Sequence, residues 1–162
     1  MKFNYHIVMD ASKEALWAML EDFQRVSACM PGVERMEQVS EDAYEGVMRV
    51  RIGPMGINFN GAVTLDRDEA SGTWKMTAQA QDRKVGGGAR AVIAAVVGEE
   101  APGRAAMDIA ADVQLMGRLG ELGQPLIKRK ADTMLQEFAA NLQREVGSRG
   151  PRAKRAESEG TP

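Results

Sequence analysis

The chain has 162 residues, of which 44% are apolar and 27% charged, and its formal net charge is −2. This composition is typical of one soluble globular domain. It argues against a nucleic-acid-binding protein, which needs a strong basic excess on one face. The single cysteine excludes an internal disulfide, and the longest apolar run, AVIAAVV, is far shorter than the roughly 18 residues that span a membrane. The N-terminal MKFNYHIVMD lacks the apolar stretch of a signal peptide, so we expect a cytoplasmic protein.

The first 30 residues predict a strand followed by two short helices. Residues 2–9 alternate apolar and polar side chains, which indicates a half-buried strand. Asp10 or Ser12 then caps a helix whose apolar residues recur at helical spacing. A second helix is expected over residues 22–29, and a Pro-Gly pair ends it.

A series of alternating segments follows, separated by turn residues. Strands are expected over residues 33–40, 43–52, 57–65, 74–81, 89–97 and 105–115. Strands at this spacing, joined by hairpin-type turns, predict a meandering antiparallel sheet.

The last ordered element is expected to be a long helix over residues 117–146, with apolar residues spaced by three and four. Pro125 interrupts this pattern and predicts a kink or a fresh start. Residues 147–162 are polar and basic, and we expect them to be a disordered tail. The tail carries a basic cluster formed by Arg149, Arg152, Lys154 and Arg155. We interpret this cluster as solvated, with weak attraction to an anionic membrane as the alternative.

This order of elements predicts an α+β protein with the helix-grip arrangement. In that fold a curved antiparallel sheet of about seven strands wraps around a long C-terminal helix, and two short helices follow the first strand. We expect one such domain over residues 1–146, followed by the tail at 147–162.

Three features suggest chemistry but are better interpreted as structure. The stretch GGGARA at residues 86–91 matches a dinucleotide-binding fingerprint, yet the segment before Gly98 is too short for a crossover helix, so a glycine hairpin or bulge is expected. His6 and Cys29, the sole residues of their types, cannot supply a zinc site. Cys29 lies at a helix C-terminus, where the dipole disfavours a thiolate, so we expect a buried packing residue; Arg25 alone favours reactivity.

The chain contains 11 methionines against 4 Phe, 2 Tyr and 2 Trp. Methionine is flexible and polarizable, so this bias fits a surface that adapts to an apolar guest, or a core in which Met replaces Leu. No His, Asp and Ser arrangement or pair of carboxylates suggests a catalytic site, so we expect no catalytic residue, no metal and no enzyme activity.

Five segments together resemble the G-subunit family of carbon monoxide dehydrogenase, a branch of the START-like or SRPBCC superfamily. They are ASKEALWAMLED, ACMPGVE, VRIGPMGINFNGAVTL, GGGARA and RLGELGQPLIKRKADTMLQEFAANL. The resemblance covers residues 1–146. It implies a helix-grip fold with an apolar cavity between the sheet and the long helix.

The resemblance also implies a non-catalytic accessory protein that works beside a molybdenum-containing carbon monoxide dehydrogenase or a related molybdenum hydroxylase. Members of the family are associated with membrane recruitment of that enzyme and with binding of a respiratory quinone. We therefore expect no covalent cofactor, a carried menaquinone or ubiquinone, and transient peripheral contact with the inner face of the cell membrane. Many members end in an apolar membrane segment, whereas residues 147–162 here are polar.

The apolar residues of the sheet face and of the long helix are the candidates for lining such a cavity. They are Phe59, Trp74, Met76, Met107, Leu115, Leu119, Leu122, Leu126 and Phe138. In a helix-grip fold the Pro31-Gly32 turn lies near the cavity rim, so Met30 and Pro31 are candidates for its entrance.

Two other functions stay open from the sequence. One is a docking or assembly adapter for the hydroxylase, with an inert core and no ligand. The other is an enzyme of the cyclase or hydratase type, as the superfamily includes such activities; the lack of convergent acid and base residues disfavours it.

Overall fold

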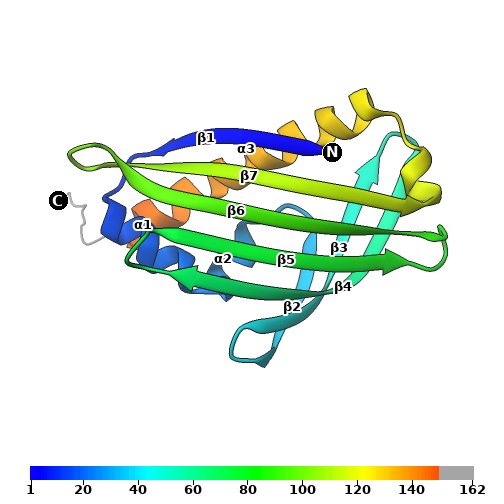
Figure 1. Cartoon of the computed structure of the whole chain (residues 1–162), viewed down its shortest axis with the longest axis horizontal. Helices are drawn as coiled ribbons and strands as arrows, with labels where there is room; N and C mark the ends of the chain where they lie inside the picture. Colours follow the sequence, from blue (N-terminus) through cyan, green and yellow to red (C-terminus); the bar gives the residue numbers. More distant parts are fainter. Residues whose placement is uncertain (150–162) are drawn as a thin grey trace.

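Seven antiparallel strands form one sheet in the order β1-β7-β6-β5-β4-β3-β2, and this sheet curves around a long C-terminal helix in the computed structural model (Figure 1). The structure describes residues 1–149. The elements are β1 (Lys2–Met9), α1 (Lys13–Leu20), α2 (Phe23–Cys29), β2 (Val33–Ser40), β3 (Ala43–Ile52), β4 (Met55–Asp68), β5 (Thr73–Asp82), β6 (Gly87–Ala101), β7 (Arg104–Gly117), the 3-10 helix η1 (Arg118–Glu121) and α3 (Gln124–Arg149). The α+β helix-grip prediction is confirmed.

The strands and short helices lie where the residue pattern predicts them, but the start of the long helix does not. β7 continues to Gly117, η1 follows it, and α3 begins only at Gln124. Pro125 therefore stands in the first turn of α3, where its missing N–H removes no helical hydrogen bond. Of the two predicted effects of Pro125, the fresh start is the one observed.

The predicted boundary between the domain and its tail differs from the end of the helix. α3 continues to Arg149, past the expected boundary at residue 146. The rest of the predicted tail, with Arg152, Lys154 and Arg155, lies outside the described residues.

Capping side chains and one glycine fix the segment between β1 and β2. The Ser12 Oγ accepts a hydrogen bond from the Ala15 N–H at 3.0 Å and caps α1. The Asp22 carboxylate accepts one from the Arg25 N–H at 3.3 Å and caps α2. Gly32 then turns the chain into β2 with a φ of 90°, and a Cβ there would lie 2.1 Å from the Arg49 carbonyl oxygen. Only glycine fits this turn.

Two further glycines lie where β2, β3, β4 and β5 approach one another closely. Gly46 pairs with Gly61, which in turn pairs with Ala80. A Cβ on Gly46 or Gly61 would lie 2.3 Å from a carbonyl oxygen of the neighbouring strand. Glycine in a strand interior commonly marks a tight bend or a close backbone approach.

Two separate groups of buried residues hold the sheet against α3. The larger one joins α1, α2, the inner face of the sheet and the C-terminal half of α3, where Phe138, Leu142 and Val146 are buried. The smaller one contains Val50, Ile52, Ile57 and Leu119 at the end of the molecule formed by the β3–β4 turn and η1. We call these the main core and the end core.

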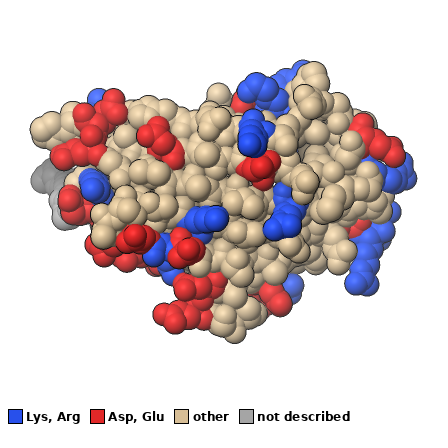
Figure 2. Space-filling view, in the orientation of Figure 1, with Lys and Arg blue, Asp and Glu red and all other residues tan. Residues whose placement is uncertain are grey.

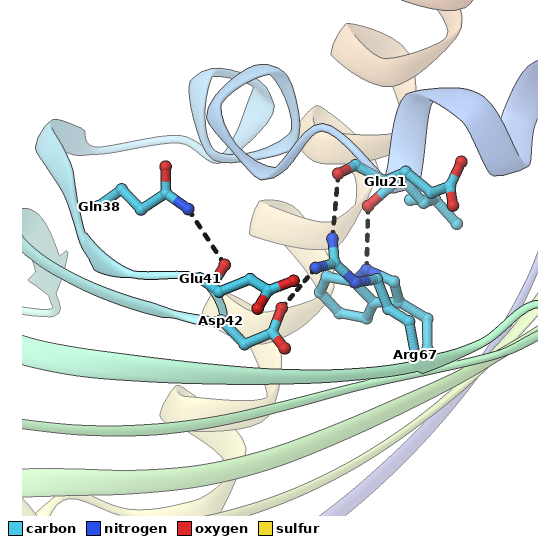
Figure 3. A network of polar contacts seen from close by, with 7 residues as sticks. Glu21, Gln38, Glu41, Asp42 and Arg67 are labelled. Atoms are coloured by element: carbon cyan, nitrogen blue, oxygen red, sulfur yellow. Dashed lines mark hydrogen bonds and ion pairs between the residues drawn. The ribbon is translucent and has the colours of Figure 1, made fainter.

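Arg67 of β4 connects α1 to the hairpin between β2 and β3 (Figure 3). One of its terminal nitrogens donates to the Glu21 carbonyl at 3.0 Å, and the other lies 2.6 Å from the Asp42 carboxylate. Within the hairpin, the Gln38 amide donates to the Glu41 carbonyl at 3.1 Å. Because Glu21 ends α1, the guanidinium also complements the negative end of the helix dipole.

Asp82 organises the turn between β5 and β6. Its buried carboxylate accepts hydrogen bonds from the backbone N–H groups of Asn58 at 2.7 Å, Lys84 at 2.9 Å and Val85 at 3.2 Å. These backbone donors hold the pKa of the Asp82 carboxyl below its ordinary value.

We predict that Arg67→Met lowers the free energy of unfolding by about 1 kcal/mol, because two hydrogen bonds donated by the charged guanidinium are lost. Urea unfolding of the full chain measures this change. Arg104→Met, at the exposed start of β7, is the matched control and should change stability little. Equal effects of the two variants would contradict a connecting role for Arg67.

We predict that Asp82→Asn lowers the free energy of unfolding at pH 7, since one amide oxygen cannot replace two charged acceptors. The folded-state pKa is lowered, so the stabilisation is fully present above the ordinary Asp pKa of about 3.9 and is lost as pH falls through the folded-state pKa. The gap between wild type and variant should therefore narrow towards pH of about 2. Asp66→Asn, on an exposed position of β4, is the control. A gap that stays constant with pH would sink the prediction.

Candidate functional site

A cavity of about 380 Å³ lies between the sheet and α3. Its volume falls within the range of about 300–1,000 Å³ that is usual for small-molecule sites. Its lining comes from every strand, from α1 and α2, and from α3 between Ala131 and Phe138. Met48, Phe59 and Met134 belong both to this lining and to the border of the end core, so the cavity is bounded at that end by packed side chains.

Short side chains on the inner face of the sheet create this space. The cavity lining contains Gly46, Gly61, Ala78, Ala80, Ala89, Ala91, Ala95 and Ala111. These residues take inward-facing positions that larger side chains fill in an ordinary sheet core. The first half of α3 is packed correspondingly loosely, because its apolar residues up to Leu135 are only partly buried.

The structure places most of the predicted lining residues in the cavity wall. They are Met30, Pro31, Phe59, Trp74, Met76, Met107 and Phe138. Met30 and Pro31 are partly exposed, and their role as the entrance stays a prediction. That any of these residues touches a ligand stays a prediction.

Four predicted residues do not line the cavity: Leu115, Leu119, Leu122 and Leu126. They belong to the end core instead, where Leu119 is fully buried. The physical reason is the late start of α3. η1 folds Leu119 and Leu122 back over the end of the sheet, and Leu126 lies against the β3–β4 turn, 3.0 Å from where a Cβ on Gly53 would be.

Three polar side chains of the cavity wall have hydrogen-bond partners. The Ser27 hydroxyl donates to the Gln24 carbonyl at 3.0 Å, and the Trp74 indole N–H donates to the Leu20 carbonyl at 3.1 Å. The Tyr5 hydroxyl donates to Asp132 at 2.9 Å. Burial and the Asp132 carboxylate raise the pKa of Tyr5 to about 12, so its hydroxyl stays protonated at neutral pH.

The methionines occupy both kinds of position considered for them, the cavity wall and the packed core. Six of the 11 line the cavity: Met30, Met36, Met48, Met76, Met107 and Met134. Met9 and Met19 are fully buried in the main core away from the cavity, as simple filling residues.

Cys29 and His6 lie outside the cavity lining. Cys29 is buried, and burial together with the nearby Glu145 carboxylate raises the pKa of its thiol, against the opposing effect of Arg25. The prediction of a packing residue is confirmed. His6 is exposed, with its Nδ1 2.6 Å from the Asp108 carboxylate, which raises the pKa of the imidazole. Within residues 1–149, no three metal-ligating side chains gather into a site for an ion.

The glycine-rich stretch at residues 86–91 starts the second strand of a hairpin, as predicted. Gly86 takes a φ of 81° in the turn and β6 begins at Gly87. The segment therefore has no crossover helix that could bind a dinucleotide.

Sequence reasoning named some of the large residues of the cavity wall, but it missed others, such as Phe3, Tyr5 and Met134, and it missed the small ones. The available signal was alanine at inward-facing positions of three consecutive strands. These residues are Ala78 and Ala80 of β5, Ala89 and Ala91 of β6, and Ala111 of β7. Small residues at adjacent inward positions predict empty space rather than packed core.

Solved structures with the same fold come from several bacteria. A conserved protein from Geobacillus kaustophilus is 16% identical, with a TM-score of 0.83, over 91% of this chain and 96% of that one. A START superfamily protein from Mycobacterium smegmatis is 15% identical, with a TM-score of 0.64, over 91% and 97%. The Zhui aromatase/cyclase from Streptomyces sp. R1128 is 13% identical, with a TM-score of 0.64, over 93% and 98%.

At these identities the likeness shows the fold alone. No curated protein sequence matches the chain. The family model for the G-subunit of carbon monoxide dehydrogenase (CoxG), however, matches residues 6–147. This match spans most of the sheet, most of the cavity wall and nearly all of α3, and the chain therefore belongs to the CoxG family of carbon monoxide dehydrogenase proteins.

Proposed function

We propose that the protein is a non-catalytic accessory protein that binds a lipophilic ligand in the cavity between its sheet and α3. The ligand is a respiratory quinone, menaquinone or ubiquinone, and the protein links a molybdenum hydroxylase of the carbon monoxide dehydrogenase type to the membrane. The observation that carries the proposal is the apolar cavity of about 380 Å³. Family membership supports the choice of partner.

The chemistry of the cavity wall favours a carrier over an enzyme. The lining contains no Asp, Glu, His, Lys, Arg or Cys, and Tyr5 is its one titratable residue. General acid–base catalysis needs groups that exchange protons near neutral pH. Apolar ligand surface, in contrast, gains about 25 cal/mol for each Å² that leaves water for such a wall.

The charge distribution supports contact with an anionic membrane. Strand directions place the β3–β4 turn, the β5–β6 turn, η1 and the start of α3 at one end of the molecule. We call this the basic end, and it carries Arg51, Arg83, Lys84, Arg118, Lys128, Arg129 and Lys130. Of these, only Lys128 forms an ion pair with a described residue.

The opposite end is acidic. Its turns carry Glu41, Asp42, Asp68, Glu69, Glu99 and Glu100. Figure 2 shows most of the blue side chains toward the right-hand end of the molecule, beside a smaller red group, and most of the red ones at the left and below. Such a separation orients a protein against a negative surface, at about 1 kcal/mol for each basic residue near the lipid. The helices in the described part of the chain are too short or too polar to span a membrane.

We predict that Ala111→Phe abolishes quinone binding, because the new ring occupies the cavity where Ala111 now leaves space. Purified protein is incubated with quinone-containing membranes and the bound lipids are extracted and identified. Ala110→Phe, on the exposed face of the same strand, is the matched control and should retain wild-type binding. No quinone in wild-type protein would sink the carrier proposal.

The same pair of variants separates the carrier from the adapter. If Ala111→Phe still captures the hydroxylase and supports its coupling to the respiratory chain, the interaction surface carries the function and the ligand is dispensable. If capture persists but coupling is lost, the cavity is required.

We predict that Arg118→Glu with Arg129→Glu weakens binding to vesicles of anionic phospholipid by tenfold or more, as about 1 kcal/mol is lost for each removed cation. Lys13→Glu with Arg104→Glu makes the same change in net charge away from the basic end and should have little effect. Sedimentation with vesicles at low and physiological salt measures both. Equal losses would show that net charge, rather than the basic end, governs the contact.

A further inference from the structure

A polar contact connects β1 to α3 at the edge of the apolar cavity. The Tyr5 ring lines the cavity, and its hydroxyl donates to Asp132 Oδ1 at 2.9 Å. The other carboxylate oxygen of Asp132 lies 3.5 Å from the Lys128 ammonium, one helical turn earlier. We call these three residues the seam cluster.

The seam cluster differs from the other polar groups of the wall. Ser27 and Trp74 donate to main-chain carbonyls of the helices, which cannot move without unwinding the backbone. Tyr5, in contrast, is held by a side chain on the other layer, and both Tyr5 and Asp132 are only partly buried. Their hydrogen bond can be exchanged for one with a ligand at little cost, because the groups left behind reach solvent.

The cluster also borders a second, more open pocket of about 420 Å³. That pocket is lined by Met1, Lys2, Phe3, Gln124, Pro125 and Lys128. Phe3 lines both spaces, and its ring is parallel to that of Tyr5, with centroids 6.4 Å apart. The side of the apolar cavity at Tyr5 therefore lies next to a more open pocket of mixed polar and apolar lining, to which Lys128 of the seam cluster belongs.

We propose that the seam cluster binds the polar head of the cavity ligand, and that this head is uncharged and carries a carbonyl or hydroxyl oxygen. The inference rests on the proposed function, since it assumes a ligand in the cavity. A ligand carbonyl accepts a hydrogen bond from the Tyr5 hydroxyl, and a ligand hydroxyl donates one to the Asp132 carboxylate. The apolar part of the ligand lies along the alanine-rich face of the sheet.

The charge of the seam cluster favours an uncharged ligand head over an anionic one. Asp132 and Lys128 form an ion pair, so the cluster as a whole is close to neutral. A carboxylate or phosphate head would approach the Asp132 carboxylate and be repelled by it. A pure hydrocarbon makes no use of the cluster, whereas an uncharged head with an oxygen gains a hydrogen bond from Tyr5 without placing a second negative charge beside Asp132.

The test compares three probes: decylubiquinone, an uncharged quinone; diphenylhexatriene, a hydrocarbon; and palmitate, an anion. Tyr5→Phe should weaken decylubiquinone binding by about tenfold through the lost hydrogen bond, and leave diphenylhexatriene binding unchanged. Tyr44→Phe removes the other phenol of the chain, outside the cavity lining, and is the matched control. Fluorescence titration of the full chain gives each dissociation constant.

A second variant separates recognition from support of the fold. Asp132→Asn keeps an acceptor for Tyr5 but removes the negative charge, so palmitate binding should strengthen severalfold while diphenylhexatriene binding stays constant. A purely structural role would change all three probes together and would overturn the inference. Unchanged decylubiquinone binding in Tyr5→Phe would overturn it as well. If no probe binds the wild-type chain, the proposed function itself fails.

Discussion

The structure depends on a difference in side-chain size: large side chains pack against α3 at the two ends of the sheet, whereas small ones face it in the middle. At one end the main core fastens the C-terminal half of α3 through Phe138, Leu142 and Val146, and at the other end the end core packs around Leu119. Between these two contacts the inner face of the sheet carries glycine and alanine. A helix held at both ends cannot collapse onto short side chains, so space is left below it. Empty space costs free energy because its lining loses packing contacts, and a bound apolar molecule would recover them.

The apolar cavity that results also restricts which polar groups its wall can carry. A polar group that faces an apolar cavity without a partner costs about 1–3 kcal/mol, and the side chains of Ser27, Trp74 and Tyr5 all have partners. Those of Ser27 and Trp74 are bound to backbone carbonyls and serve the fold. Tyr5, in contrast, is bound across the gap between the two layers, so it combines a position in the wall with a replaceable partner.

Much of the fold was predictable because its causes are local. Alternation along the strands, the Ser12 cap and the turn at Gly32 each act within a few residues, and the structure confirms them. The cavity was harder, because periodicity says which side of an element faces inward but not how far along the element the partner lies. Leu119 and Leu126 follow the inward pattern, yet the 3-10 helix before α3 turns them into the end core. The alanines of β5 and β6 carried the better signal, since Ala78 pairs with Ala91 and Ala80 with Ala89 once the register of this hairpin is known.

Charge shows the same limit of one-dimensional reasoning. The net charge of −2 does not reveal the basic end, which exists because antiparallel strands bring alternate turns to the same side of the molecule. Residues 83–84 and 128–130 are far apart in the chain and reach that side together, while the acidic turns at 41–42 and 99–100 reach the other. Carboxylates at the other end cancel these cations in the net charge of the chain, but they lie too far away to neutralise them locally. Long-range attraction depends on where charges lie within a screening length of about 8 Å, so the separation, rather than the total, determines how this domain meets a charged surface.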